Sequence, residues 1–197
     1  MLDALASPLT GSRVALEPIE PRHEAGLRAA SADPQVFRWM PYDLSDAASF
    51  DAWFAGVREA AARRELAAFA TVERAGGTVI GSTCYLEPRP HDRSVEIGGT
   101  WLAPAAWGGG ANVEATLLMF AHAFDVLGCV RVELKTDARN ERSRRAMEAL
   151  PAQFEGVHRQ HRVLADGTLR DSAWYSVLDR EWPEVRANLQ RRLAARG

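Results

Sequence analysis

The hydrophobic pattern of the first third of the chain predicts a strand followed by two helices. Residues 13–18 alternate between apolar and polar side chains and end at a proline, which predicts a short strand. Pro21 suits the first turn of a helix over residues 21–31. A second helix is expected to begin at Ser45 as its N-cap, with Asp46 in its first turn. The apolar residues of that helix recur on one face, at Phe50, Trp53, Phe54 and Val57.

The middle of the chain predicts three strands and a long helix. Residues 67–73 and 79–86 read as a hairpin, because a glycine-containing connection joins two strand-like runs. A polar loop then leads to a strand over 95–102. The glycine-rich segment 107–112 precedes a periodic helix, and Gly128 suits the position after its end. Its apolar side chains recur at helical spacing, at Val113, Leu117, Phe120, Phe124 and Leu127.

The last third of the chain completes a mixed α/β pattern. The expected elements are a strand over 129–135, a short helix capped by Asn140 and ending near 150, strands over 154–163 and 170–178 around a turn at 165–168, and a polar helix opened by Pro183. The order β-α-α-β-β-β-α-β-α-β-β predicts an α/β (α+β) fold, with a mixed sheet flanked by helices on both faces. We expect a single domain over 1–197, with a core of about 13–179 and a C-terminal helical extension at 183–195.

Composition excludes several classes of protein. The 197 residues carry a net charge of −2, which argues against a general nucleic-acid binder. The sequence contains no apolar run of the ~18 residues that a membrane span needs, and the N-terminus lacks the basic region of a signal peptide. Cys84 and Cys129 lie in apolar, strand-like runs and are expected to be buried thiols, not disulfides or metal ligands. We therefore expect a cytoplasmic protein without a metal.

The glycine loop has two interpretations. Gly108, Gly109 and Gly110 could form a flexible connector, or they could hold an anion. A helix N-terminus offers free backbone N–H groups, and glycine lets the backbone approach a phosphate closely. The loop is not a P-loop, because no Gly-Lys-Ser/Thr follows it. It is not a dinucleotide fingerprint either, because Val113 stands where a small residue is required.

The order of these segments resembles a known family. The strand and turn at 96–104, the loop at 107–112 and Glu114 look like the central motif of the GNAT superfamily of N-acetyltransferases, in its RimJ/RimL (ribosomal-protein-alanine N-acetyltransferase) branch. Further segments match the family downstream, at 131–136, 140–143, 149–150 and 154–156. The resemblance covers about residues 13–179 and implies a GNAT-type splayed sheet.

The resemblance also implies acetyl-CoA as co-substrate, in a gap where the central strand leaves its neighbour. The pantetheine arm is expected to pair with the backbone of Trp101 and Leu102 and with Asn140. A backbone N–H is expected to polarise the thioester carbonyl. The remaining cofactor-binding residues are expected in the loop and helix start, at Trp107, Gly108, Gly109, Gly110, Ala111, Asn112 and Val113. Four arginines near the next helix start form a solvated face, or one of them meets the 3′-phosphate: Arg139, Arg142, Arg144 and Arg145.

Three residues are candidates for proton transfer. Ser143 matches the position that hydrogen-bonds the leaving sulfur in RimL-type enzymes, or it completes the first helical turn. Glu96 is the first choice for the base, with an orienting ion pair as its alternative role. His161 is the second choice, although a lone strand histidine is usually structural. The matching RimL carboxylate is replaced by Arg162, which cannot act as a base, and Glu133 reads as a strand-surface carboxylate.

Other positions depart from the family or suggest an acceptor pocket. Asn112 replaces a small residue, and Gly109 replaces a cation that would meet a phosphate. Pro151 replaces a glycine, so we expect a corner built without positive φ. Core packing explains most of the aromatic side chains near the acceptor helices, but one or two are expected to line a pocket: Trp39, Met40, Tyr42, Trp53 and Phe54.

The expected function is acetyl transfer to a primary amine, either an N-terminal α-amine or a small amine. The alternatives are a small-molecule (antibiotic or metabolite) acetyltransferase and a non-catalytic acyl-CoA-binding or sensor domain. The sequence leaves the acceptor and the oligomeric state open, with a homodimer among the alternatives.

Overall fold

A computed structural model describes residues 1–164 and 166–196 and contains one eight-stranded sheet. The strand order is β1-β2-β3-β4-β5-β6-β8-β7, and β5 and β6 are parallel while the other neighbouring pairs are antiparallel. The strands are β1 (Leu9–Thr10), β2 (Val14–Pro18), β3 (Leu66–Glu73), β4 (Val79–Arg89), β5 (Ser94–Leu102), β6 (Arg131–Asp137), β7 (Gln153–Val163) and β8 (Leu169–Leu178).

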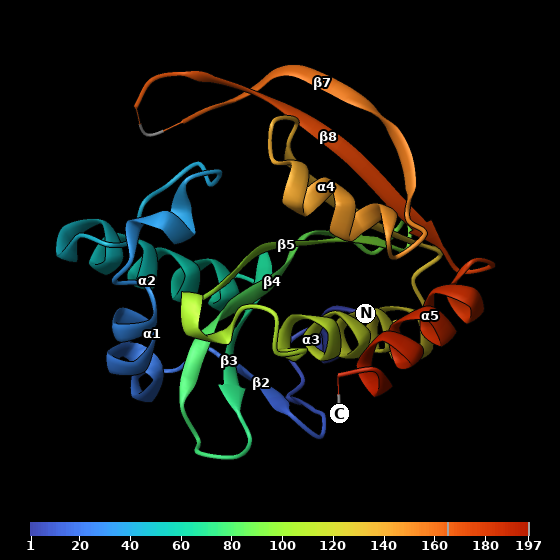
Figure 1. Cartoon of the computed structure of the whole chain (residues 1–197), viewed down its shortest axis with the longest axis horizontal. Coiled ribbons are helices and arrows are strands. Elements are labelled where there is room, and N and C mark those ends of the chain that lie inside the picture. The colour runs from blue at the N-terminus through green and yellow to red at the C-terminus, as the bar shows by residue number, and fades with distance from the viewer. Residues whose placement is uncertain (165, 197) are drawn as a thin grey trace.

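Helices cover both faces of this sheet, as the pattern predicted (Figure 1). One face carries α1 (Glu24–Ala30) and α2 (Ala47–Ala62), and the other carries α3 (Ala111–Ala121), α4 (Glu141–Glu148) and α5 (Trp182–Ala194). Short 3₁₀ turns add η1 (Leu2–Ala4), η2 (Pro21–His23), η3 (Pro34–Phe37) and η4 (Pro104–Ala106), and α3 continues into a π turn, η5 (His122–Val126).

Two hydrophobic cores follow from strand alternation. On β3, Phe69 enters the core beneath α3 and α5, while the next residue, Ala70, enters the core beneath α1 and α2. On β5, Val95 and Ile97 belong to the α3 core, so Glu96 between them projects from the opposite face. Along this part of β5, one face of the sheet is therefore apolar and the other carries a carboxylate.

Strands β5 and β6 pair over a short stretch and then separate. Their register joins Ser94 to Arg131 and Glu96 to Glu133, and no further pair joins them within the described residues. Both strands continue for several residues beyond this point. The sheet is thus splayed next to Glu96, which confirms the GNAT-type architecture expected from the resemblance.

Some element boundaries differ from the expectations. The N-cap of α2 is Asp46, not Ser45, because Oδ1 of Asp46 accepts a hydrogen bond from the Ser49 N–H at 2.9 Å. The expected polar loop after residue 86 is shorter, since β4 runs on to Arg89 and pairs with Ser94. Gly128 does follow the long helix with φ of 67°. Of the expected turn at 165–168, Ala165 lies outside the described residues.

The corner at Pro151 also differs from its prediction. Its φ is 23°, so the expectation of a corner without positive φ is wrong. The buried side chains of Leu150 and Ala152 anchor both sides of the proline, and the Ala152 N–H donates to the Met147 carbonyl at 3.2 Å. Because the proline ring favours φ near −65°, this corner is strained.

Candidate functional site

The glycine loop forms the N-terminus of α3. Gly108 and Gly110 have φ of 81° and 90°, values that favour glycine, and Gly110 is the N-cap residue. Within the described residues no side chain caps this helix, so the N–H groups of its first turn remain available to an anion. The Trp107 indole donates to the Leu102 carbonyl at 2.8 Å, which fixes the loop against the end of β5.

Arginines from distant parts of the chain approach this loop. Nη1 of Arg13 donates to the Gly109 carbonyl at 3.4 Å, and Nη2 donates to the Arg196 carbonyl at 2.8 Å. The Arg142 guanidinium lies 4.3 Å from the Trp107 ring centroid. Arg13 and Arg142 thus bring positive charge to the loop, in which Gly109 occupies the position where the resemblance leads us to expect a cation. Arg13 was missed in the sequence because 96 residues separate it from the loop.

The four arginines near α4 have different surroundings. Arg139 is paired with Asp137 at 2.8 Å, and Arg145 with Glu141 at 2.5 Å. Arg144 donates to the Tyr175 hydroxyl at 3.1 Å. Arg142 forms no hydrogen bond or ion pair with the part of the chain that is described, and it is therefore the arginine most available to a phosphate.

Asn140 and Ser143 lie together at the start of α4. Oδ1 of Asn140 accepts the Ser143 N–H at 3.1 Å and so caps the helix, as predicted. The amide nitrogen of Asn140 is not used in this cap. Ser143 is half-buried, and its hydroxyl forms no hydrogen bond with any described residue. The cap and a cofactor contact are therefore compatible at this position.

Glu96 is buried beside the point where the strands separate. It is 1 % exposed, and its Oε2 accepts a hydrogen bond from Nζ of Lys135 at 2.5 Å. Burial raises the pKa of Glu96 above its usual range, and the Lys135 charge opposes this rise. Nζ of Lys135 also lies 4.9 Å from the centroid of the Trp174 ring. Lys135 was missed in the sequence because its contact with Glu96 spans 39 residues and leaves no local signal.

His161 lies near the same lysine. Its Nδ1 is 3.0 Å from Oγ of Ser172, and its ring packs at a steep angle to Trp174, with centroids 5.6 Å apart. Burial and the nearby charge of Lys135 lower its pKa below the usual value, so the imidazole is neutral at neutral pH. Both candidate bases therefore share the neighbourhood of Trp174.

Two other charged candidates are engaged elsewhere. Glu133 pairs with Arg89 at 2.6 Å and with Arg131 at 2.9 Å. These cations hold its pKa below the usual range although burial raises it. Arg162 lies 3.9 Å from Glu87, with its side chain 48 % exposed.

The aromatic residues expected near an acceptor fall into two groups. Phe54 is buried against Phe50, and Trp53 packs on Trp101 with ring centroids 6.0 Å apart, so both belong to the α2 core together with the partly buried Met40. Tyr42 is also partly buried against this core, but Tyr42 and Trp39 lie closer to the open end of the sheet. A Cβ on Gly99 would lie 3.7 Å from the Tyr42 hydroxyl, and the Arg139 guanidinium is 5.4 Å from the Trp39 ring centroid.

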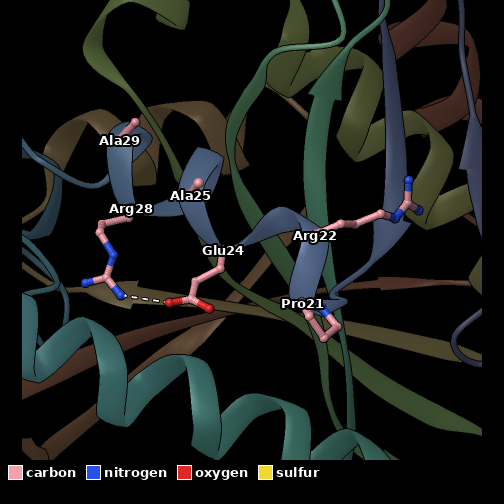
Figure 2. A pocket seen from close by; sticks show the side chains of 6 residues that line it. All are labelled: Pro21, Arg22, Glu24, Ala25, Arg28 and Ala29. Carbon is pink, nitrogen blue, oxygen red and sulfur yellow. Dashed lines mark hydrogen bonds and ion pairs between the residues drawn. The ribbon is translucent and has the colours of Figure 1, made fainter.

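One surface hollow of about 550 Å³ lies apart from these residues. Figure 2 shows it along η2 and α1, where Arg28 pairs with Glu24 at 3.0 Å. Its lining consists of Pro21, Arg22, Glu24, Ala25, Arg28 and Ala29. None of the candidate site residues contributes to it, so we assign it no role in the chemistry.

The acidic, histidine and cysteine side chains form no metal-binding cluster in the described part of the chain. Among these residues, no group of three or more His, Cys, Asp or Glu side chains could hold a metal ion. Cys84 and Cys129 are buried free thiols. No helix within residues 1–164 and 166–196 combines the length and apolar character that a membrane span requires.

Comparisons with known proteins agree with this geometry. Residues 13–153 match the family model described as "Acetyltransferase (GNAT) domain". A GCN5-related N-acetyltransferase from Brucella melitensis is 34% identical, with a TM-score of 0.88, and the match covers 95% of this chain and 86% of that one. A T. thermophilus protein, assigned provisionally as an acetyltransferase, is 39% identical, with a TM-score of 0.83 and coverage of 94% and 96%.

A more distant structure is that of Mycobacterium smegmatis RimJ in complex with CoA-disulfide. It is 23% identical, with a TM-score of 0.79, and the match covers 96% of this chain and 94% of that one. At this identity the likeness shows the fold alone. A search of curated proteins found no significant match.

Proposed function

The chain belongs to the GNAT acetyltransferase family, and we propose that it transfers the acetyl group of acetyl-CoA to an α-amine or another amine of low pKa. Members of this family are acetyl-CoA-dependent acyltransferases, so the reaction class follows from the family. The observation that carries the proposal is the separation of β5 from β6 directly beside the buried carboxylate of Glu96. We also infer that the chain is one GNAT domain, with a core of about 13–179 and a helical extension at 183–195.

The glycine loop supports a cofactor site on the α3 side of the sheet. In this proposal the pyrophosphate binds the free N–H groups from Gly108 to Val113, and Arg13 and Arg142 supply the charge that Gly109 lacks. The pantetheine arm enters the gap beside Trp101 and Leu102, next to Asn140. The RimJ structure, solved with CoA-disulfide, is consistent with a CoA derivative in this fold.

The proton transfers can be assigned to the two sides of the gap. The amine nitrogen attacks the thioester carbonyl carbon, the carbon–sulfur bond breaks, and the departing sulfur takes a proton. Glu96 accepts the amine proton in our proposal, with Lys135 holding its carboxylate in place. His161 is the alternative base, and Ser143 hydrogen-bonds the leaving sulfur. A raised pKa suits Glu96 to this role, because it makes the carboxylate a stronger base.

The expected acceptor follows from the charge state of its amine. An α-amine with pKa of about 7.7–8.0 is neutral at pH 7 far more often than a lysine amine at about 10.4. A cationic amine would also be repelled by Lys135. We therefore expect α-amines to be acetylated in preference to internal lysines.

A pair of peptides tests this proposal by release of the CoA thiol. One peptide has a free N-terminus and no lysine, and the other has a blocked N-terminus and one internal lysine. The free N-terminus should be acetylated faster, with mass spectrometry locating the acetyl group. Faster acetylation of the blocked lysine peptide would contradict the proposed acceptor. Amino acids, polyamines and aminoglycosides in the same assay test the small-molecule alternative.

A further inference from the structure

Arg170, at the start of β8, is a buried cation without an acidic partner. The residue is 6 % exposed. Its Nε donates to Oγ of Ser172 at 3.2 Å, and its Nη1 donates to the Trp39 carbonyl at 3.3 Å. Within residues 1–164 and 166–196, no carboxylate oxygen lies within 4.0 Å of the guanidinium, and its Nη2 forms no hydrogen bond. The contacts to Ser172 and Trp39 are to neutral oxygens, so its charge is not compensated by contact.

Other arginines of this region are more exposed and yet are paired. Their partners are Glu133 for Arg89 at 2.6 Å, Glu155 for Arg131 at 2.5 Å and Asp137 for Arg139 at 2.8 Å. The exposed fractions of these three arginine side chains are 34%, 28% and 55%. Burial of a charge without a counter-charge is unfavourable, so the most buried of the four has the greatest need for an anion.

The surroundings of Arg170 place it on the acceptor side of the sheet. Ala173, Tyr175 and Val177 of β8 enter the α3 core, so Arg170 and Ser172 project from the opposite face, as Glu96 does. Ser172 also contacts His161, and Trp39 belongs to the loop that carries Tyr42.

The pKa of Arg170 is consistent with a buried positive charge that has no counter-charge in contact with it. Burial lowers the pKa of its guanidinium below the usual value. The negative charges of Asp137 and Glu96 oppose this, and the positive charges of Arg162 and Arg139 add to it. The guanidinium therefore lies within electrostatic reach of the proposed base.

We propose that Arg170 binds a carboxylate carried by the acceptor, so that the acceptor is an amine with a nearby carboxylate. The inference rests on the proposed transferase function and names its substrate class. Nη2 and the second N–H of Nη1 can form two parallel hydrogen bonds to a carboxylate. A carboxylate on the acceptor would also offset the repulsion that Lys135 and Arg170 exert on an incoming ammonium group. A free amino acid and a peptide with an acidic first residue offer the same chemistry.

Paired acceptors test this inference and separate its two sources. Alanine is compared with alaninamide, and the peptide amide Asp-Ala-Ala with Asn-Ala-Ala, by CoA-thiol release with rates expressed per concentration of neutral amine. The parent protein should prefer the carboxylate member of one pair, in kcat/KM, by roughly 10- to 100-fold, the range that a charged hydrogen bond provides. The pair that shows this preference identifies the source of the carboxylate.

Variants of Arg170 assign the preference to this side chain. Arg170→Met should raise KM for the carboxylate member by the same factor and leave the amide member unchanged. Arg170→Lys keeps the charge but not the planar fork, so it should retain part of the preference, and it serves if the methionine variant does not fold. Arg162→Met is the matched control, because Arg162 pairs in register with Arg170 but is solvent-exposed. It should keep the parental preference.

The outcomes distinguish this inference from the transferase function. Equal turnover of both members of each pair by the parent would overturn the carboxylate assignment and leave the transferase function intact. An equal loss with both members in Arg170→Met, at unchanged melting temperature, would overturn it as well and show a structural role. Binding of alanine to the CoA complex that depends on Arg170, without turnover of any amine, would support the carboxylate site and contradict acetyl transfer.

Discussion

At the residue scale, Glu96 combines two properties that a general base needs. Burial raises its pKa above the usual range, which strengthens the carboxylate as a base, and the Lys135 ion pair opposes this rise and favours the ionised form. Its position between Val95 and Ile97 directs it away from the α3 core, toward the side from which the acceptor would arrive. The lysine thus positions the carboxylate without reaching the cofactor face.

Glu96→Gln keeps the size of the side chain but removes its basicity. Turnover should fall by about 10²–10⁴-fold at neutral pH, and the deficit should shrink as pH rises because more of the amine is then already neutral. The measurement is kcat/KM between roughly pH 6 and 9, a range that brackets the amine pKa. Glu133→Gln removes a neighbouring carboxylate that is held by Arg89 and Arg131, and should retain near-parental turnover. Near-parental turnover of Glu96→Gln at every pH would transfer the assignment to His161.

Glu114 anchors the N-terminal strand region to the helix that carries the glycine loop. Its carboxylate accepts four hydrogen bonds, from N and Oγ of Ser12 and from the backbone N–H groups of Arg13 and Val14, at 2.7–2.9 Å. Burial raises its pKa, but these hydrogen bonds together outweigh burial and leave the pKa below the usual value. The same contacts hold Arg13 beside Gly109.

Glu114→Gln should lower the free energy of unfolding by about 1–3 kcal/mol at neutral pH, because four partly buried or buried donors lose a charged acceptor. A carboxyl group whose pKa is depressed on folding stabilises the protein above its unfolded pKa, and this contribution is lost as pH falls through the folded pKa. The difference between parent and variant should therefore shrink in acid. Denaturant unfolding at several pH values measures it, and Glu141→Gln, at an exposed ion pair, is the control. A constant difference down to pH values below the folded pKa would contradict this account.

At the element scale, the start of α3 is where we propose that the pyrophosphate binds. Gly110 and Gly108 have positive φ, so a substitution there strains the backbone as well as the site. A Cβ on Gly109 meets open space, and its φ is not in the left-handed region. Gly109 is therefore the position at which charge can be tested without strain.

Gly109→Glu should weaken acetyl-CoA binding by roughly 10- to 100-fold, because it brings a negative charge close to the pyrophosphate. Gly109→Gln should bind within a few-fold of the parent. At Gly76 a Cβ would lie 3.6 Å from Oγ1 of Thr78, an ordinary van der Waals contact, so Gly76→Glu serves as the distant control. Titration calorimetry measures the affinity. Parental affinity in a folded Gly109→Glu protein would show that the pyrophosphate binds elsewhere.

Much of the fold follows from local sequence. The periodic apolar residues of α3 and the cap at Asn140 are local signals, and both elements formed where expected. Ser45 and Asp46 are adjacent capping residues, so the sequence could not choose between them before the helix register was known. The prediction of a corner without positive φ at Pro151 was wrong because the buried side chains on both sides determine its backbone conformation. The general preference of proline for negative φ does not take such tertiary contacts into account.

The site was less accessible to the sequence. The glycine loop was found from its own residues as a candidate anion site, and Glu96 and Ser143 were found through their resemblance to a family motif. The roles of all three remain predictions. Lys135, Arg13 and Arg170 carry no local signal, since their contacts span 39, 96 and 131 residues. Only the register of β5, β6 and β8 brings Lys135 and Arg170 to one face of the sheet.

At the scale of the whole molecule, the splayed sheet separates the side on which we propose that the cofactor binds from the side on which we propose that the acceptor binds. The glycine loop and Ser143 lie with α3 and α4 on one side, while Glu96, Lys135 and Arg170 project from the other. The opening between β5 and β6 lies between them and is where we propose that the thioester meets the amine. In this proposal the cofactor and the acceptor approach from different directions. Sequence changes in α1, α2 and the Trp39 loop could then alter the choice of acceptor without changing the cofactor site.

The central claim is that this opening and the glycine loop form an acetyl-CoA site, and the most direct test is thermal unfolding with acetyl-CoA. At 100 times its dissociation constant, acetyl-CoA should stabilise the folded protein by roughly 2.7 kcal/mol, and NADH and ATP at equal concentration should stabilise it much less. An unchanged melting curve of ligand-free protein on addition of saturating acetyl-CoA would contradict the account.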